Sequence, residues 1–147
     1  MHSGIRAMEA GDREAVLKMM RAFYASPAVL TGGSEDIFAA DFHACISDDP
    51  FLEGYIFQDG ETVQGYAMLA KSFSTEFGKP CVWIEDLYLR EAYRGLGLGS
   101  RFLRFIREKY PDCVFRLEVE AENTRAMHVY RTCGFDTIPY TEMIRKG

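Results

Sequence analysis

The sequence predicts an α/β fold in which helices flank one mixed β-sheet on both faces. Strand-like and helix-like segments alternate along the chain, and a glycine-rich turn joins one strand-like segment directly to a strongly amphipathic helix. The chain has 147 residues, of which 48% are hydrophobic, and this is enough for one ordinary core but too little for two. We therefore expect a single domain over residues 1–147.

The first third of the chain is expected to form a short strand and two helices. An apolar start at Ile5 gives the strand, and Asp12 is a plausible N-cap for the first helix. Apolar side chains then recur at helical spacing, at Val16, Met19, Met20 and Phe23. After a break at Thr31–Gly33, the segment Glu35–Ile46 is expected to be the second helix.

The middle of the chain is expected to be β-structure. The dipeptide Asp59-Gly60, which is typical of tight hairpin turns, separates the strand-like segments Leu52–Gln58 and Thr62–Ser72. Cys81–Arg90 is expected to be a further strand.

The last third alternates between helix and strand. Four segments follow, namely a helix at Gly97–Tyr110, a strand at Cys113–Glu120, a helix at Asn123–Cys133 closed by Gly134, and one or two strands within Phe135–Arg145.

The composition excludes several classes of function. A formal net charge of -5 gives no general attraction to nucleic acid or to an anionic membrane. The four cysteines lie far apart without a C-x-x-C pair or a histidine placed to complete a zinc site, so we expect reduced thiols and no metal. We find neither a signal peptide nor an apolar run of about 18 residues, so a cytoplasmic location without membrane contact is expected.

The glycine-rich turn runs from Arg94 to Gly99 and carries the main functional signal. Alternate glycines let the main chain approach a ligand closely, and the following helix directs its free amide groups at that ligand, which suits phosphate. A P-loop is excluded because Ser100 and Arg101 follow the last glycine, where that motif needs lysine and then serine or threonine. The spacing of the dinucleotide fingerprint also fails. The turn therefore indicates a pyrophosphate site.

Two motifs in this order resemble the GCN5-related N-acetyltransferase (GNAT) family. The first is R-x-x-G-x-G at Arg94–Gly99, and the second is N-x-x-A-x-x-x-Y-x-x-x-G-F at Asn123–Phe135. With the strand Trp83–Leu89 before them, the resemblance covers about residues 82–135. It implies a GNAT-type fold, and acetyl-CoA as the co-substrate.

The resemblance also implies which residues contact the co-substrate. The main chain of Leu87, Tyr88 and Leu89 would bind the pantetheine arm, and Asn123 would help to hold the co-substrate or would simply cap its helix. The pyrophosphate would lie on the residues of the glycine-rich turn, Arg94, Gly95, Leu96, Gly97, Leu98 and Gly99.

Acetyl transfer to an amine requires the amine to lose a proton and the leaving thiolate to gain one. The spacing of the second motif favours Tyr130 as the acid. Period-two alternation places Glu85 on an otherwise apolar strand face with Cys81, Trp83, Leu87 and Leu89, where its pKa would be raised and it could act as the base. Asp86, on the opposite face with Tyr88, is the second candidate, and a bulge in this strand would exchange the faces.

The acceptor is expected to be a primary amine that receives the acetyl group directly in a ternary complex. The segment Ile84–Leu89 followed by Tyr93-Arg94-Gly95 is also similar to the diamine and polyamine acetyltransferases. Polyamines are therefore one option beside amino acids, aminoglycoside-like amines and protein or peptide amines. The alternative from another class is a non-catalytic sensor of acyl-CoA. Because members of the family often dimerise, a homodimer is expected.

Overall fold

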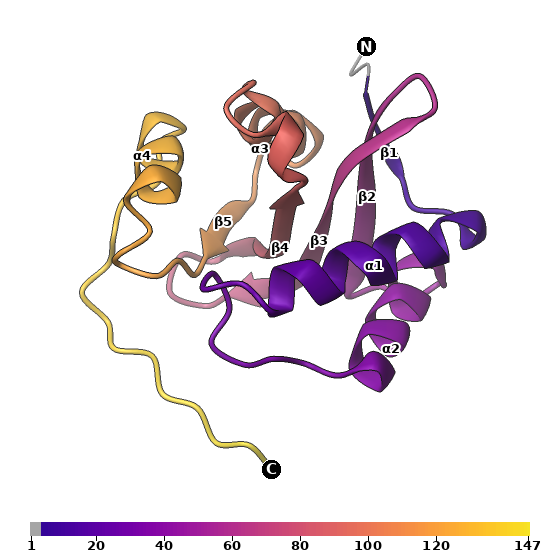
Figure 1. Cartoon of the computed structure of the whole chain (residues 1–147). Coiled ribbons are helices and arrows are strands. Elements are labelled where there is room, and N and C mark those ends of the chain that lie inside the picture. Colours follow the sequence, from indigo (N-terminus) through magenta and orange to yellow (C-terminus); the bar gives the residue numbers. More distant parts are fainter. Residues whose placement is uncertain (1–3) are drawn as a thin grey trace.

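The computed structural model describes residues 4–147 and contains a mixed β-sheet of five strands (Figure 1). The strands are β1 (Ile5–Ala7), β2 (Leu52–Asp59), β3 (Thr62–Ser74), β4 (Lys79–Leu89) and β5 (Val114–Leu117). They lie side by side in this order, and neighbours are antiparallel except for the parallel pair β4 and β5. The α/β class and the mixed sheet predicted from the sequence are confirmed.

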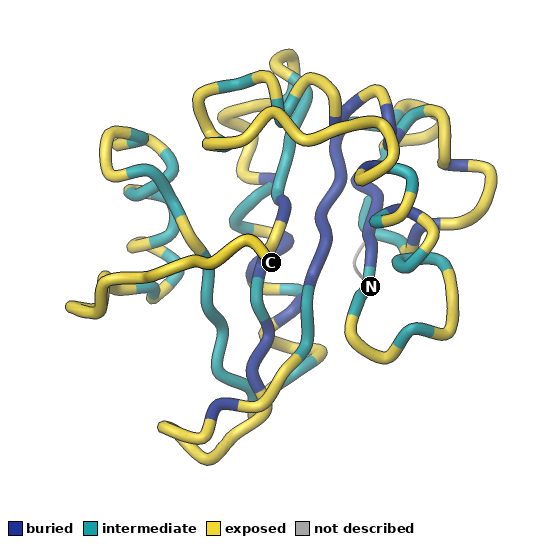
Figure 2. Tube along the Cα trace, turned by 90° about the horizontal axis from the view of Figure 1, so that it is seen from below, coloured by how far each residue is buried: buried dark blue, intermediate teal, exposed yellow. Residues whose placement is uncertain are grey.

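Helices cover both faces of the sheet, as expected (Figure 1). The helices are α1 (Arg13–Tyr24), α2 (Glu35–Ile46), α3 (Leu98–Lys109) and α4 (Thr124–Thr132), with short 3-10 turns at Ala10–Asp12 and Glu91–Tyr93. One core cluster packs α1 and α2 against Ile56, Tyr66 and Met68 of the sheet. The other packs α3 against Phe57 and Leu69 on the opposite face. The strands between them are buried in the middle of the molecule (Figure 2).

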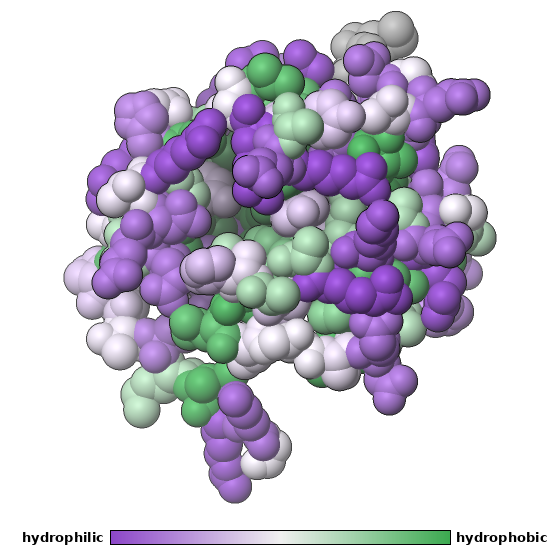
Figure 3. Space-filling model, in the orientation of Figure 1, coloured by the Kyte–Doolittle hydropathy of each residue, from purple (hydrophilic) through white to green (hydrophobic). Residues whose placement is uncertain are grey.

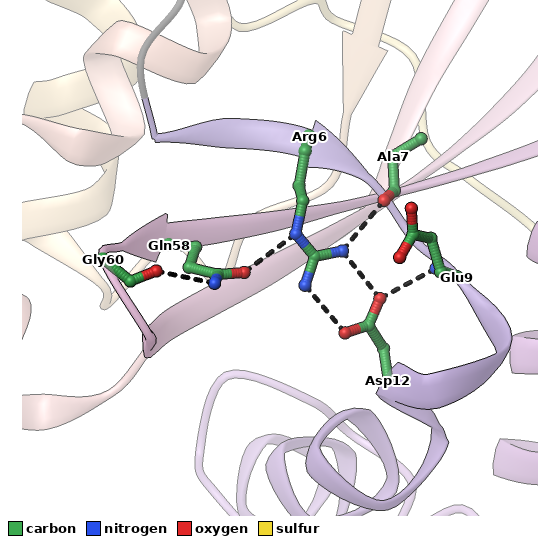
Figure 4. A network of polar contacts seen from close by, with 6 residues as sticks. All are labelled: Arg6, Ala7, Glu9, Asp12, Gln58 and Gly60. Atoms are coloured by element: carbon green, nitrogen blue, oxygen red, sulfur yellow. Dashed lines mark hydrogen bonds and ion pairs between the residues drawn. The ribbon is translucent and has the colours of Figure 1, made fainter.

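The residue before α1 has a different role from the predicted one. Asp12 makes no side-chain cap to the helix. Its carboxylate instead accepts two hydrogen bonds of 2.8 Å from the guanidinium of Arg6 and one from the Glu9 amide (Figure 4). Arg6 also donates to Gln58 in β2. Asp12 therefore stands at the N-cap position of α1, as predicted, but its carboxylate binds Arg6 and the Glu9 amide and caps no amide of that helix.

A β-bulge interrupts β4 at Glu85. Met68 of β3 pairs with Asp86, and the next residue, Leu69, pairs with Ile84, so Glu85 has no partner of its own in that ladder. The extra residue reverses the alternation of faces beyond it. Leu87 consequently packs in the core cluster under α3.

Strict alternation placed Cys81 and Trp83 on the same face of β4 as Leu87 and Leu89. The bulge separates these two pairs, so this prediction was wrong. Glu85 does not share one continuous strand face with Cys81, Trp83, Leu87 and Leu89. The placement of Asp86 with Tyr88 on the other face is confirmed, because Asp86 contacts Tyr66 and Tyr88 packs in the same core cluster, on the side of α1 and α2.

The segment after α4 forms no strand, although the sequence predicts one or two within Phe135–Arg145. Residues 136–147 are extended and exposed, and they run away from the base of α4 (Figure 1). A strand requires backbone hydrogen bonds to a neighbouring strand, and within residues 4–147 no backbone group of this segment makes one. The strand β5 also ends earlier than predicted, at Leu117.

Candidate functional site

A cleft opens where β4 and β5 separate. The two strands pair from Cys81↔Val114 to Ile84↔Leu117, and β4 then continues alone on this side to Leu89. Beyond Ile84 the main chain of β4 therefore has no β5 partner in the part of the chain that the structure describes. The cleft measures about 700 Å³, and Leu87, Tyr88 and Leu89 form part of its wall. Figure 3 shows recessed apolar surface between hydrophilic atoms on this face of the molecule.

The glycine-rich turn forms one end of the cleft. Gly95 and Gly97 have φ values of 77° and 81°, which favour glycine over other residues. The helix α3 starts directly after Gly97, with no side-chain cap and no acidic residue in its first turn. Within residues 4–147 its first amides therefore have no protein partner, and they carry the positive end of the helix dipole, which is suited to an anion. Leu98 and Gly99 line the cleft beside them.

Two arginines lie at the same end. The Arg94 Nε donates to the Leu89 carbonyl at 2.8 Å, and its guanidinium lies 5.6 Å from the centre of the Tyr88 ring. Arg125 from α4 also lines the cleft, and its Nη2 would lie 2.7 Å from a Cβ added at Gly95. Sequence reasoning missed Arg125, although it stands between the Asn and Ala of the second motif.

The helix α4 supplies the other two predicted residues. The Asn123 Oδ1 accepts a hydrogen bond of 3.2 Å from the Ala126 amide, so Asn123 is an N-cap, and it also lines the cleft. Tyr130 lines the cleft and packs on Phe135, with ring centres 6.0 Å apart. Burial raises the pKa of the Tyr130 phenol, and its hydroxyl has no hydrogen-bond partner within the described residues.

Three carboxyl groups, from the bulge region of β4 and from α2, interact electrostatically. Asp86 is 4% exposed and accepts hydrogen bonds from the hydroxyls of Tyr24 (3.0 Å) and Tyr66 (2.8 Å). Burial raises the pKa of Asp86, and burial together with the charge of Asp86 raises the pKa of Asp41, on α2, to about 6. The pKa of Glu85 is also raised, first by partial burial of its carboxyl and then by Asp86 and Asp41. Although Glu85 retains exposed surface, its carboxyl is favoured in the protonated form relative to a free one.

Most of the predicted contact residues line one cleft, but not all of them do. Leu96 is 63% exposed and does not line it, and Glu85 lies outside its wall. The turn after α1 contributes wall residues that sequence reasoning missed, namely Phe23, Ser26, Pro27 and Ala28. No motif marks that turn, so its position against β4 depends on how α1 packs.

Residues 4–147 contain neither a metal-binding cluster nor a membrane-spanning helix. No group of three or more histidine, cysteine or acidic side chains is arranged to hold a metal ion. None of the helices is both long and apolar enough to span a bilayer.

One cleft is thus lined by the uncapped start of α3, the open main chain of β4 and the Tyr130 side chain. The chain belongs to the acetyltransferase (GNAT) family, whose model matches residues 16–135. It is an N-acetyltransferase that depends on acetyl-CoA.

Relatives and solved structures agree with this assignment. The chain is 30% identical to a thialysine N-epsilon-acetyltransferase of Bos taurus over 94% of this chain and 86% of the relative. It is 29% identical to a spermidine/spermine N(1)-acetyltransferase-like protein of Homo sapiens, over 68% of this chain but only 15% of that protein. An aminoglycoside N-acetyltransferase in complex with CoA has the same fold, with a TM-score of 0.77, 18% identity and coverage of 97% of this chain and 93% of that one.

Proposed function

We propose that this enzyme moves the acetyl group of acetyl-CoA directly to the primary amine of a small cationic acceptor, with both substrates bound at once. The observation that carries the proposal is the single cleft that contains the glycine-rich corner, the open main chain of β4 and the Tyr130 phenol. The carboxyl groups of Glu85 and Asp86, at the bulge in β4, interact electrostatically with that of Asp41 on α2.

The co-substrate is proposed to lie along the cleft with its pyrophosphate at the start of α3. The amides from Gly95 to Gly99 would bind the phosphates, with Arg94 and Arg125 supplying positive charge. Leu87, Tyr88 and Leu89 would bind the pantetheine through main-chain groups, because this part of β4 lacks a β5 neighbour. The Arg94 side chain would have to release the Leu89 carbonyl, which it now occupies, if that oxygen is used.

The proposed reaction moves two protons off the nitrogen and one onto the sulfur. Glu85, directly or through water, takes a proton from the ammonium, and the neutral amine attacks the thioester carbonyl. As the tetrahedral intermediate collapses, the C–S bond breaks and Tyr130 donates its proton to the departing sulfur. The extra proton on the attacking nitrogen then passes, directly or through water, to the Tyr130 phenolate, which restores the phenol. The raised pKa of Tyr130 keeps the phenol protonated and so available as a donor, and its hydroxyl is not engaged elsewhere in the described chain. The products are the acetylated amine and CoA.

The charge of the site favours a cationic acceptor. Within residues 4–147, Asp41, Glu85 and Asp86 form no ion pair with lysine or arginine, so an ammonium group would relieve their mutual repulsion. The names of two relatives, thialysine and spermidine/spermine acetyltransferases, support acceptors of this kind, and we favour polyamines and lysine-like amino acids. Protein or peptide amines are the second choice.

Other properties complete the proposal. We propose one domain over residues 1–147, a cytoplasmic homodimer, and no requirement for a resident metal, nucleic acid or membrane. The net charge of -5 supports the absence of nucleic-acid binding.

The test is a panel of amines assayed for CoA release from acetyl-CoA. The panel contains a polyamine, a lysine analogue, an aminoglycoside and a peptide with a free N-terminus. We expect turnover with one of the first two and much slower release with the peptide. Tight CoA binding without turnover on any amine would instead indicate a sensor, and failure to bind CoA would contradict both functions.

A further inference from the structure

A second cavity lies at the C-terminal end of α4, on the side of α3 (Figure 1). It measures about 780 Å³ and is bounded by α3, by Phe115 of β5 and by the turn at residues 133–136. Of the described residues, Ser100 alone lines both this cavity and the cleft. Because ligand pockets commonly enclose about 300–1,000 Å³, this cavity is large enough for a ligand of its own.

Two arginines of α3 line the cavity. Arg104 and Arg107 are three residues apart, so they lie on the same side of the helix. Both are exposed, and within residues 4–147 neither guanidinium makes an ion pair or a hydrogen bond. Asp136 also lines the cavity, but among the described residues it is paired with neither arginine. Two unpaired guanidinium groups favour an anion with two charges, such as a phosphate monoester.

The rest of the wall is suited to a planar ring and to hydroxyl groups. Phe115 and Phe135 are both half-buried, and they line the cavity together with Leu103. Aromatic side chains bind nucleobases by stacking. The oxygens of Ser100 and Asp136 are able to accept hydrogen bonds from a ribose. This combination favours a nucleoside monophosphate over a bare phosphate or an apolar ligand.

Phe135 connects the cavity to the cleft. Its ring packs on that of Tyr130, which lines the cleft, with ring centres 6.0 Å apart. No residue of α4 is fully buried, so the helix that carries Tyr130 is only weakly packed against the rest of the chain. A ligand held between α3 and the end of α4 would restrict the position of this helix, which also carries Arg125.

We propose that this cavity binds a nucleoside monophosphate, and that the bound ligand strengthens the binding of CoA in the cleft through α4. The phosphate would lie between Arg104 and Arg107, and the base against Phe115 and Phe135. Because both ligands would restrict the same helix, each would favour the binding of the other. The proposal goes beyond acetyl transfer, because it requires neither an amine nor turnover.

Calorimetry with uridine monophosphate tests the site, first without CoA and then with the cleft saturated by CoA. We expect this probe to bind in both cases, and uridine or inorganic phosphate to bind about tenfold more weakly or less. Displacement of uridine monophosphate by CoA would place the probe in the cleft and overturn the proposal. Inorganic phosphate that binds as tightly would indicate an adventitious ion only, which would also overturn it.

Substitutions on α3 separate the cavity from the general charge of the helix. We expect Arg104→Gln and Arg107→Gln each to weaken the binding of uridine monophosphate by about tenfold or more. Arg101→Gln removes the same charge from the same helix outside the cavity and should leave this binding unchanged. An equal loss in Arg101→Gln would contradict the proposal.

The alkylation rate of Cys133 shows whether the cavity is filled. Cys133 lines the cavity, whereas Cys113, which is also half-buried, does not. With a maleimide and peptide mapping, we expect uridine monophosphate to slow the alkylation of Cys133 and to leave that of Cys113 unchanged. An unprotected Cys133 in protein saturated with the probe would place the ligand elsewhere and overturn the proposal.

The coupling to the cleft is measured as the affinity for CoA. With saturating uridine monophosphate we expect CoA to bind about fivefold more tightly or better in wild type, and this gain to be lost in Arg104→Gln. An unchanged affinity in wild type would contradict the link through α4. Failure of CoA to bind at all would contradict the proposed function instead, since the binding of uridine monophosphate is also measured without CoA.

Discussion

The hydroxyl of the half-buried Tyr130 is free within residues 4–147, unlike the hydroxyls of the fully buried Tyr55 and Tyr66. The hydroxyl of Tyr66 is bound to Asp86 and that of Tyr55 to Glu53, whereas that of Tyr130 has no partner in residues 4–147. A packing role would need only the ring. A free phenol in the wall of the cleft is available to donate a proton to a bound substrate.

Replacing Tyr130 by phenylalanine separates these roles. For Tyr130→Phe we expect turnover to fall by about 10²-fold or more. The affinity for CoA and the free energy of unfolding should hardly change, because no hydrogen bond within the protein is lost. Steady-state kinetics, calorimetry and thermal unfolding measure the three quantities.

Tyr66→Phe is the matched control, because it removes a buried hydroxyl that donates to Asp86. It should destabilise the fold by about 1–3 kcal/mol. Unchanged turnover in Tyr130→Phe would show that the phenol only packs.

Glu85 is the proposed base, and its raised pKa determines the expected pH dependence. A base is active when deprotonated, so the rate should fall as the pH is lowered through this raised pKa. In Glu85→Gln we expect a lower rate near neutral pH and a smaller loss at high pH, where more of the amine is already deprotonated. The measurement is the profile of kcat/KM against pH.

Glu118→Gln serves as the control for a general effect of charge, because Glu118 interacts electrostatically with Glu85. It should weaken binding of a cationic amine and keep the acidic limb of the profile. Glu85 would be removed from the mechanism if the profile of Glu85→Gln kept the wild-type shape, and Asp86 would then be the next candidate.

At the scale of elements, the strand-to-helix corner is the part that the sequence predicted best. The positive φ of Gly97 and the start of α3 at Leu98 agree with the expectation of a glycine turn that leads directly into a helix. Gly99, the second glycine of the R-x-x-G-x-G motif, lies inside α3, and its φ is not positive. The backbone conformation at Gly99 therefore does not require glycine.

Gly99→Ala tests whether a ligand is the reason for that glycine. A Cβ at Gly99 would have no protein atom within 4 Å, and alanine is favoured over glycine in a helix. We expect unchanged or higher thermal stability together with weaker CoA binding, by about tenfold or more, if the phosphates pack against this position. Gly11→Ala, which is equally uncrowded in the short turn before α1, should leave CoA binding unchanged. Wild-type affinity of folded Gly99→Ala would argue against close approach here.

Two elements could not be predicted from local patterns. The bulge at Glu85 leaves no local signature in a segment that otherwise alternates, and it is visible only in the pairing of β4 with β3. The segment after Phe135 has apolar residues suited to a strand, but strand formation depends on a partner edge that pattern reasoning cannot locate. By contrast, the predicted bounds of α2 agree with the structure, because Ser34 caps it and its apolar spacing is regular.

For the whole molecule, the sequence motifs predicted the part of the site proposed to bind the co-substrate. The remaining wall of the site became visible only in the folded structure. Asn123, Tyr130 and the glycine-rich turn come from the second half of the chain, where both motifs lie. The opposite wall comes from the turn after α1, and Asp41 comes from α2. These residues approach β4 only because α1 and α2 pack across one face of the sheet.

The part of the site proposed to bind the amine acceptor therefore depends on how the two halves of the chain pack together. Tyr24 at the end of α1 is hydrogen-bonded to Asp86 of β4, which ties the first helix to the strand that carries the proposed base. Selectivity for the amine should depend on this first half of the chain, and binding of CoA on the second.

A crystal structure of the protein with CoA tests the central proposal most directly. We expect the pyrophosphate oxygens within hydrogen-bonding distance of the amides between Gly95 and Gly99, and the sulfur near the Tyr130 hydroxyl, in the opening between β4 and β5. CoA bound elsewhere on the molecule, with the start of α3 in contact only with protein or solvent, would contradict it.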